Sequence, residues 1–271
     1  PLHLAARDGH RGAMQVLVAA KADVNAEDNR GWTPLREAGI LKHYGALQVL
    51  IDANADVDAK DNEGLALLYL ASEQGDNETV QILIDAKADV DVKDDDDLTS
   101  LHFAAKQGHI DIVKMLINAK ATVDARDIDF LTPLHLAAEE GLTDIVEFLI
   151  KAKATIDARD IDEKTSLYLA AAQGHTHTVK MLINAKATVD AKDINDVIPL
   201  HVAAGLGFND TMQVLLDAKA DVDALDIEGV TSLHFAVTQG RTDTMRILID
   251  AKATIDTKAN RTSLHYAAVK G

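Results

Sequence analysis

The chain has 271 residues, no cysteine and a formal net charge of −17, from 44 acidic and 27 basic residues. The lack of cysteine excludes disulfides, thiolate metal sites and a cysteine nucleophile, and fits a reducing compartment, so we expect a cytoplasmic protein. The acidic balance and the lack of an apolar run near ~18 residues lead us to expect no binding to nucleic acid and no association with a membrane.

A repeat of 33 residues runs along the chain. An aspartate recurs at this interval, and a leucine column keeps the same phase: Asp28, Asp61, Asp94, Asp127, Asp160, Asp193 and Asp226, with Leu35, Leu68, Leu101, Leu134, Leu167, Leu200 and Leu233. Independent columns in phase indicate internal repetition. The predicted units are a partial repeat 1–27, full repeats 28–60, 61–93, 94–126, 127–159, 160–192, 193–225 and 226–258, and a partial repeat 259–271. Residue 1 is Pro and both outer units are partial, so we expect a fragment of a longer polypeptide.

Every unit predicts two short helices and a loop. In the unit 127–159, Thr132-Pro133 is a favourable N-cap followed by Pro at the first helical position, and Gly141 ends that helix. Thr143 is the predicted N-cap of a second, more apolar helix, which an extended segment and a turn follow. Helices of about ten residues are marginal alone. We therefore expect stacked units that share one continuous core in a single domain.

The repeated residues are similar to those of the ankyrin-repeat family. The segment Thr132-Pro133-Leu134-His135 with Ala137-Ala138, and the segments 1–6 and 22–26, carry the resemblance, which covers essentially the whole chain. It implies an all-α ankyrin-repeat solenoid, in which helix-turn-helix units are joined by β-hairpin-like loops. It also implies a non-enzymatic scaffold that binds a partner protein on its concave face and hairpin tips.

The sequence departs from the family pattern at several columns. A glycine expected after the second helix is replaced in every unit: Lys21, Asn54, Lys87, Lys120, Lys153, Lys186, Lys219 and Lys252. The hairpin glycine is replaced in four units, whose turns we expect to be remodelled: Asp97, Phe130, Glu163 and Asp196. The opening histidine becomes Arg36, Tyr69 and Tyr168. The second repeat, 28–60, has Gly39 and Lys42 where the family has alanine and glycine, so we expect its first helix to be the least regular.

Eleven histidines and a run of four aspartates raise the question of a metal or catalytic site. Histidines of one column lie one repeat apart in a stack and cannot converge on a metal, so we expect them to fix the loops, as in the family. His175 and His177 could form only an incidental chelate. The run Asp94 to Asp97 lacks the pattern of a calcium loop and is expected to be a solvated hairpin tip, or a contact for a basic partner. We expect no metal, no cofactor and no catalytic residue.

The hairpin tips carry the candidate binding residues. An isoleucine follows the repeating aspartate in four consecutive units, with apolar residues two or three positions later. An apolar row on exposed loops indicates a contact site, whereas isoleucines that stack on neighbouring hairpins would be structural; both alternatives stay open. Trp32 occupies the equivalent place in the second repeat, 28–60. The predicted partner-binding residues are Trp32, Ile128, Asp129, Leu131, Glu139, Glu140, Ile161, Asp162, Ile194, Val197, Ile227, Glu228 and Val230.

Three functional interpretations follow. The first is a monomeric scaffold whose acidic surface and apolar tips bind a protein segment with basic and apolar residues. The alternative is a targeting or recognition segment of a larger enzyme or toxin, which the partial outer units would suit. The third is an engineered consensus binder. The irregular second repeat and the recurring lysines argue against it.

Overall fold

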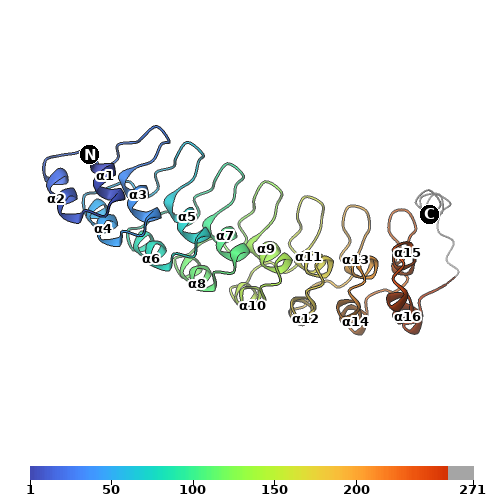
Figure 1. Ribbon diagram of the computed structural model, residues 1–271. Helices are drawn as coiled ribbons and strands as arrows, with labels where there is room; N and C mark the ends of the chain where they lie inside the picture. Colours follow the sequence, from blue (N-terminus) through green and yellow to red (C-terminus); the bar gives the residue numbers. More distant parts are fainter. Residues whose placement is uncertain (256–271) are drawn as a thin grey trace. The chain divides into compact units, whose positions relative to one another are not determined.

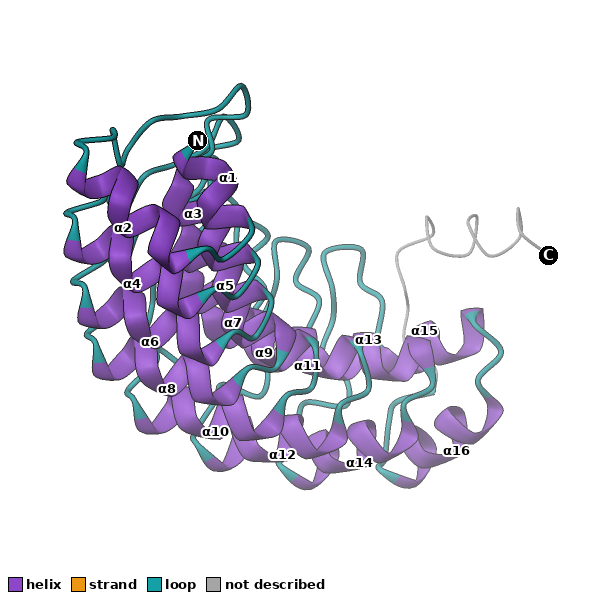
Figure 2. Ribbon diagram, turned by 60° about the vertical axis from the view of Figure 1, so that its left-hand side comes forward, coloured by secondary structure: helices purple, strands orange, loops and turns teal. Residues whose placement is uncertain are grey.

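The computed structural model describes residues 1–255, and the chain divides into two compact units, residues 1–128 and 129–271. Within the described residues the structure contains sixteen helices and no strand, only two isolated bridges at the bases of loops, Lys60 with Ala66 and Lys93 with Thr99. In each unit the odd-numbered helices form a row beside the long loops, and the even-numbered helices form a second row (Figures 1 and 2). The all-α architecture of stacked helix-turn-helix units is confirmed.

The helices of the first unit alternate between the two rows. The odd-numbered, inner helices are α1 (Leu2–Arg7), α3 (Pro34–Ile40), α5 (Leu67–Glu73) and α7 (Ser100–Gln107). The even-numbered, outer helices are α2 (Arg11–Ala19), α4 (Tyr44–Asp52), α6 (Asn77–Asp85) and α8 (Ile110–Asn118).

The second unit repeats this arrangement. Its inner helices are α9 (Pro133–Glu139), α11 (Ser166–Ala172), α13 (Pro199–Leu206) and α15 (Ser232–Thr238). Its outer helices are α10 (Thr143–Lys151), α12 (Thr176–Asn184), α14 (Asn209–Asp217) and α16 (Thr242–Asp250). The predicted partial repeat 259–271 lies outside the described residues.

The start of each inner helix follows from its sequence. Thr132 has extended backbone angles and precedes α9. Its side chain accepts the backbone N–H of His135, and the His135 side chain accepts the backbone N–H of Thr132, which together form a capping box. The outer helices begin differently from the prediction. Thr143 is the first residue of α10 and not its N-cap, because the preceding turn closes through a bond from the Thr143 N–H to the Gly141 carbonyl.

The core of each unit is shared between neighbouring repeats. The leucines of the repeating column are buried, Leu134 and Leu167 completely, and small alanines such as Ala137 and Ala170 are buried where inner helices meet. Because small side chains allow the inner helices to approach closely, the apolar face of each helix is covered by the next repeat. Packing between repeats therefore supplies stability that a helix of seven to nine residues lacks alone.

The lysine column has the left-handed backbone expected of a glycine. The φ angle is 76° at Lys120 and 71° at Lys153, and each lysine follows the C-cap residue of an outer helix. The four hairpins that lack glycine are also left-handed, with φ between 60° and 62° at Asp97, Phe130 and Glu163, and at Asp196. The expectation that these turns are remodelled is wrong. Hydrogen bonds across the turn impose the same conformation, whatever residue occupies it.

We expect Lys120→Gly to raise the free energy of unfolding by up to roughly 1 kcal/mol. A left-handed conformation costs a non-glycine residue about 1–2 kcal/mol, and the greater freedom of glycine in the unfolded chain removes part of that gain. Urea titration measures the change. Lys106→Gly, at an exposed position inside α7, is the matched control and should lower stability by about 1 kcal/mol. A loss in both variants would contradict this explanation of the lysine column.

Candidate functional site

Each hairpin is closed by the repeating aspartate. The Asp160 carboxylate accepts the backbone N–H of Asp162 at 3.0 Å and of Lys164 at 2.7 Å, and the Asp160 N–H donates to the Lys164 carbonyl. Partial burial raises the pKa of Asp160, although these N–H bonds lower it in part. Asp193 and Asp226 accept the equivalent bonds in the next two hairpins. The 33-residue aspartate column thus sets the shape of the loop that presents the tip.

Neighbouring tips are joined through their backbones. In the second unit the N–H of Ile161 donates to the Asp129 carbonyl at 2.8 Å, and the N–H of Ile194 donates to the Asp162 carbonyl at 3.0 Å. The N–H of Ile227 repeats the bond, to Asn195 at 2.9 Å. In the first unit, Ile128 bonds to Asp96 in the same way. These bonds hold consecutive tips in a fixed register.

The isoleucine side chains face solvent. Exposed fractions are 57% for Ile161, 53% for Ile194 and 70% for Ile227, which we call the isoleucine row of the second unit. Ile128 is 53% exposed in the first unit. The backbone of each residue provides the stacking bond, whereas most of its side chain is left uncovered. The later apolar tip residues Leu131, Val197 and Val230 are half-buried and support the loops.

The predicted acidic residues differ in their surroundings. Asp129, Glu140 and Glu228 are exposed, and Glu139 is half-buried in α9. Asp162 is already paired, since the Lys164 ammonium lies 2.7 Å from its carboxylate. That hydrogen bond raises the pKa of Lys164. The charge of Asp162 is therefore offset within its own hairpin.

Trp32 is half-buried in the first unit, and two arginine side chains lie over its ring. The Arg30 guanidinium lies 3.7 Å from the ring centroid, and that of Arg36 lies 5.1 Å from it. Arg30 in turn pairs with Asp28 and Glu37. Trp32 thus presents less free ring surface than its place on a loop predicts.

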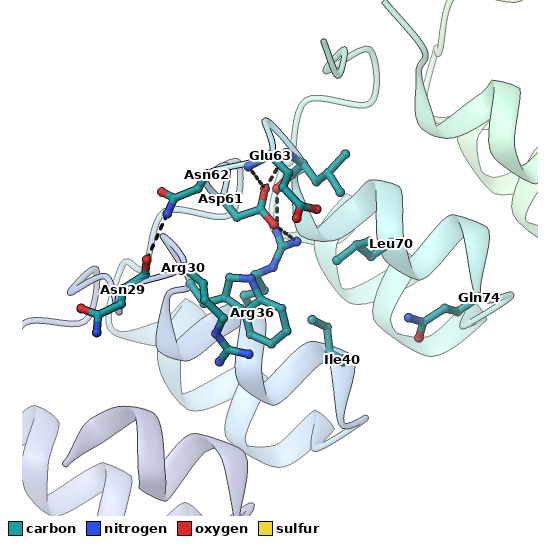
Figure 3. Close-up of a pocket in the computed structure, with 11 residues that line it drawn as sticks. Asn29, Arg30, Arg36, Ile40, Asp61, Asn62, Glu63, Leu70 and Gln74 are labelled. Carbon is teal, nitrogen blue, oxygen red and sulfur yellow. Dashed lines mark hydrogen bonds and ion pairs between the residues drawn. The ribbon is translucent and has the colours of Figure 1, made fainter. Parts of the chain in front are cut away.

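Trp32 borders a pocket of about 500 Å³ in the first unit, between two hairpins and the inner helices α3 and α5. Figure 3 shows Arg36 reaching toward Asp61, with Ile40 and Leu70 on neighbouring helices. Arg36 and Asp61 form a buried ion pair, and Arg36 also donates from Nη1 to the Leu65 carbonyl. Burial lowers the pKa of Arg36, and Asp61 counteracts this shift.

The histidine column fixes loops, as the family resemblance implies. His135 accepts the Thr132 N–H at Nδ1, so its Nε2 carries the proton and donates to the Ala158 carbonyl at 3.0 Å. His201 makes the same pair of bonds, and burial lowers its pKa. Among the described residues, no group of three or more His, Asp or Glu side chains could hold a metal ion.

The residues that replace histidine interact with the hairpin aspartates instead. Arg36 forms an ion pair with Asp61, and the carboxylates of Asp94 and Asp193, the repeating aspartates of the following repeats, act electrostatically on the hydroxyls of Tyr69 and Tyr168. Burial, followed by these carboxylates, raises the pKa of both tyrosines. Sequence reasoning noted Arg36 only as an irregularity and missed the pocket it borders. The signal available was a long cation in a histidine column, beside the single tryptophan.

Exposed apolar hairpin tips on stacked helical repeats define a repeat protein suited to binding. The family model for ankyrin repeats matches residues 1–61, 67–160, 134–226 and 200–271, and the chain belongs to the ankyrin-repeat family. Repeats of this family generally mediate protein–protein interaction, and its members are typically non-enzymatic scaffolds. None of the curated proteins compared with the chain matches it. Within the described part, every helix is too short or too polar to cross a membrane.

Proposed function

We propose that this protein is a non-catalytic scaffold that binds a partner protein along the hairpin tips and adjoining inner helices of the second unit. The observation that carries the proposal is the isoleucine row, whose side chains are more than half exposed although their backbones are fixed. Large apolar side chains on a fixed backbone lose less conformational entropy on binding than those on a mobile loop. They exclude water from an interface and supply affinity.

The charges beside the row indicate the kind of partner. Exposed Asp129 and Glu228 lie in hairpins of this unit, and exposed Glu140 follows its first inner helix, in a chain of net charge −17. Such a field attracts cationic segments and raises their association rate. The proposed partner is a protein segment that carries lysine or arginine next to apolar anchors, bound by a monomer of this chain.

Changing Ile161 and Ile194 together to serine should weaken partner binding at least tenfold, because each exposed anchor contributes about 1 kcal/mol or more. The free energy of unfolding should change by less than about 0.5 kcal/mol per site, since these side chains are largely outside the core. A photo-crosslinking residue at position 194 first identifies the partner. Calorimetry with the purified partner then measures the affinity.

Ile249→Ser is the matched control, because Ile249 is 41% exposed but lies on the outer helix α16. It should leave the affinity unchanged. If the double variant binds as the wild type does, the isoleucine row is not the binding site. If it loses several kcal/mol of stability instead, the isoleucines are structural.

A further inference from the structure

Side-chain hydrogen bonds join successive repeats in the segments that follow the outer helices. The Thr122 N–H donates to Asp91 Oδ1 at 2.8 Å, and the Thr122 hydroxyl donates to Asp91 Oδ2 at 2.7 Å. Both oxygens of the carboxylate are therefore satisfied across the joint. The same pair of bonds joins Asp157 to Thr188 and Asp223 to Thr254.

Each compact unit also contains a joint in which aspartate replaces the threonine. In the first unit the Asp89 N–H donates to Asp58 Oδ1 at 2.9 Å. In the second unit the Asp221 N–H donates to Asp190 Oδ1 at 3.1 Å. The hydroxyl donor is lost, because an ionised aspartate side chain has only acceptors, and two carboxylates meet at the joint instead. We call these two pairs the acid joints.

The acid joint of the first unit is unfavourable when both carboxylates are ionised. Asp89 is exposed, whereas Asp58 is half-buried. Partial burial raises the pKa of Asp58; the hydrogen bond from the Asp89 N–H offsets part of this shift, and the charges of Asp89 and Asp56 add to it. Because the net shift is upward, burial and repulsion outweigh the hydrogen bond.

The acid joint of the second unit has the same balance. Asp190 is half-buried, and its pKa is also raised by partial burial. The hydrogen bond from the Asp221 N–H opposes this shift, and the Asp221 charge adds to it. His201 of the same following repeat acts in the opposite direction to Asp221, without reversing the net shift.

The upward direction of both pKa shifts determines how the joints respond to pH. A carboxyl whose pKa is higher in the folded than in the unfolded chain stabilises the fold when it is protonated. The joint is therefore strongest below the unfolded pKa of about 3.9 and weakest above the raised folded pKa. A protonated Asp58 or Asp190 also regains a hydroxyl donor, which the threonine supplies in the other kind of joint.

We propose that the acid joints are a pH-sensitive device: they hold two successive repeats loosely at neutral pH and more tightly in mildly acidic solution. The repeats concerned are 28–60 with 61–93 in the first unit, and 160–192 with 193–225 in the second. Because each repeat contacts only its neighbours, a weak joint is a place where the stack opens locally. This property belongs to the array itself and is independent of the proposed partner.

Amide hydrogen exchange, followed by NMR and corrected for intrinsic rates, measures the opening of a single joint. Asp89→Asn should raise the protection factor of the residue-89 amide about threefold at pH 7, the order expected for one like-charge pair near the surface. In the wild type, protection at Asp89 relative to Thr122 should rise about threefold between pH 7 and about pH 4.5. At most about half of this pH dependence should remain in Asp89→Asn.

Asp56→Asn is the matched control. Asp56 occupies the same position one repeat earlier, but its N–H donates to the Asn25 side-chain oxygen at 2.8 Å. The substitution removes the same charge where the acceptor is a neutral amide. Protection of the residue-56 amide should therefore change by less than about 1.5-fold.

Thr122→Asp tests the reverse change, because it builds a new acid joint with Asp91. It should lower protection of the residue-122 amide about threefold or more at pH 7, with recovery near pH 4.5. Thr122→Asn removes the hydroxyl without adding a charge, and should show less than about half of that pH dependence. Thermal unfolding verifies that each variant is folded.

Three results would overturn the proposal. The first is equal protection of residue 89 at pH 7 in the wild type and in Asp89→Asn. The second is a ratio of protection between Asp89 and Thr122 that does not rise on acidification. The third is an equal loss in Thr122→Asp and Thr122→Asn at both pH values, which would assign the weakness of the joint to the missing hydroxyl and not to charge.

Discussion

Arg36→Ala should lower the free energy of unfolding by about 2–4 kcal/mol. Breaking a buried ion pair typically removes about 3–5 kcal/mol, because one charge is left buried and uncompensated. Here the loss is smaller, since the Asp61 carboxylate keeps the N–H bonds of Glu63 and Leu65. The Leu65 carbonyl also loses its bond from Arg36. Urea denaturation at neutral pH measures the difference.

Arg36→His is the control for this prediction, because histidine is the residue that most repeats have at this column. The imidazole can accept the Thr33 N–H and donate to the Ala59 carbonyl, as His135 does with Thr132 and Ala158. We expect it to retain most of the stability that Arg36→Ala loses. If Arg36→His and Arg36→Ala lose the same free energy of unfolding, histidine cannot replace the contacts that Arg36 makes with the hairpin.

Gly39→Ala should lower stability by about 1–2 kcal/mol, although alanine is the better helix former by about 1 kcal/mol. A Cβ at position 39 would lie 2.5 Å from Leu67 Cδ2, far inside normal contact. Leu67 is buried and stands where other repeats have serine or proline. Overpacking therefore outweighs helix propensity. Calorimetric unfolding and urea titration both report the loss.

Two comparisons decide whether this contact is the cause. In a Leu67→Ser background the effect of Gly39→Ala should reverse, to a gain of about 0.5–1 kcal/mol, because the space is then free. Gly205→Ala in α13 should also be stabilising, since its Cβ would approach Phe235 only to 3.5 Å. Unchanged destabilisation in the Leu67→Ser background would contradict the steric explanation.

The pair of Gly39 and Leu67 also explains an expectation that the structure corrects. The second repeat was expected to have the least regular first helix, yet α3 spans Pro34–Ile40, as long as α9 or α11. The helix continues through Gly39, whose missing side chain leaves room for Leu67 of the next repeat. Lys42 takes the left-handed turn that glycine makes elsewhere. The role of Gly39 depends on the neighbouring repeat, which a single helical pattern cannot show.

The sequence by itself determined the repeat, its two helices and the loop that follows them. Leu134 and Pro133 act within one repeat or between similar neighbours, so their positions are sufficient to predict the buried column and the helix start. The loop-closing role of the aspartate column became visible only in the structure. The sequence also placed Ile161 and Ile194 at hairpin tips, because position in the repeat fixes position on the loop.

Only the tertiary structure decided which side chains are available. Asp162 is neutralised by Lys164, Trp32 is covered in part by Arg30, and the Arg36 Nε–H is buried without an acceptor. These facts depend on distances between side chains that differ from repeat to repeat. The period of 33 residues makes the backbones alike, but exposure and pairing depend on the particular neighbours that stacking brings together.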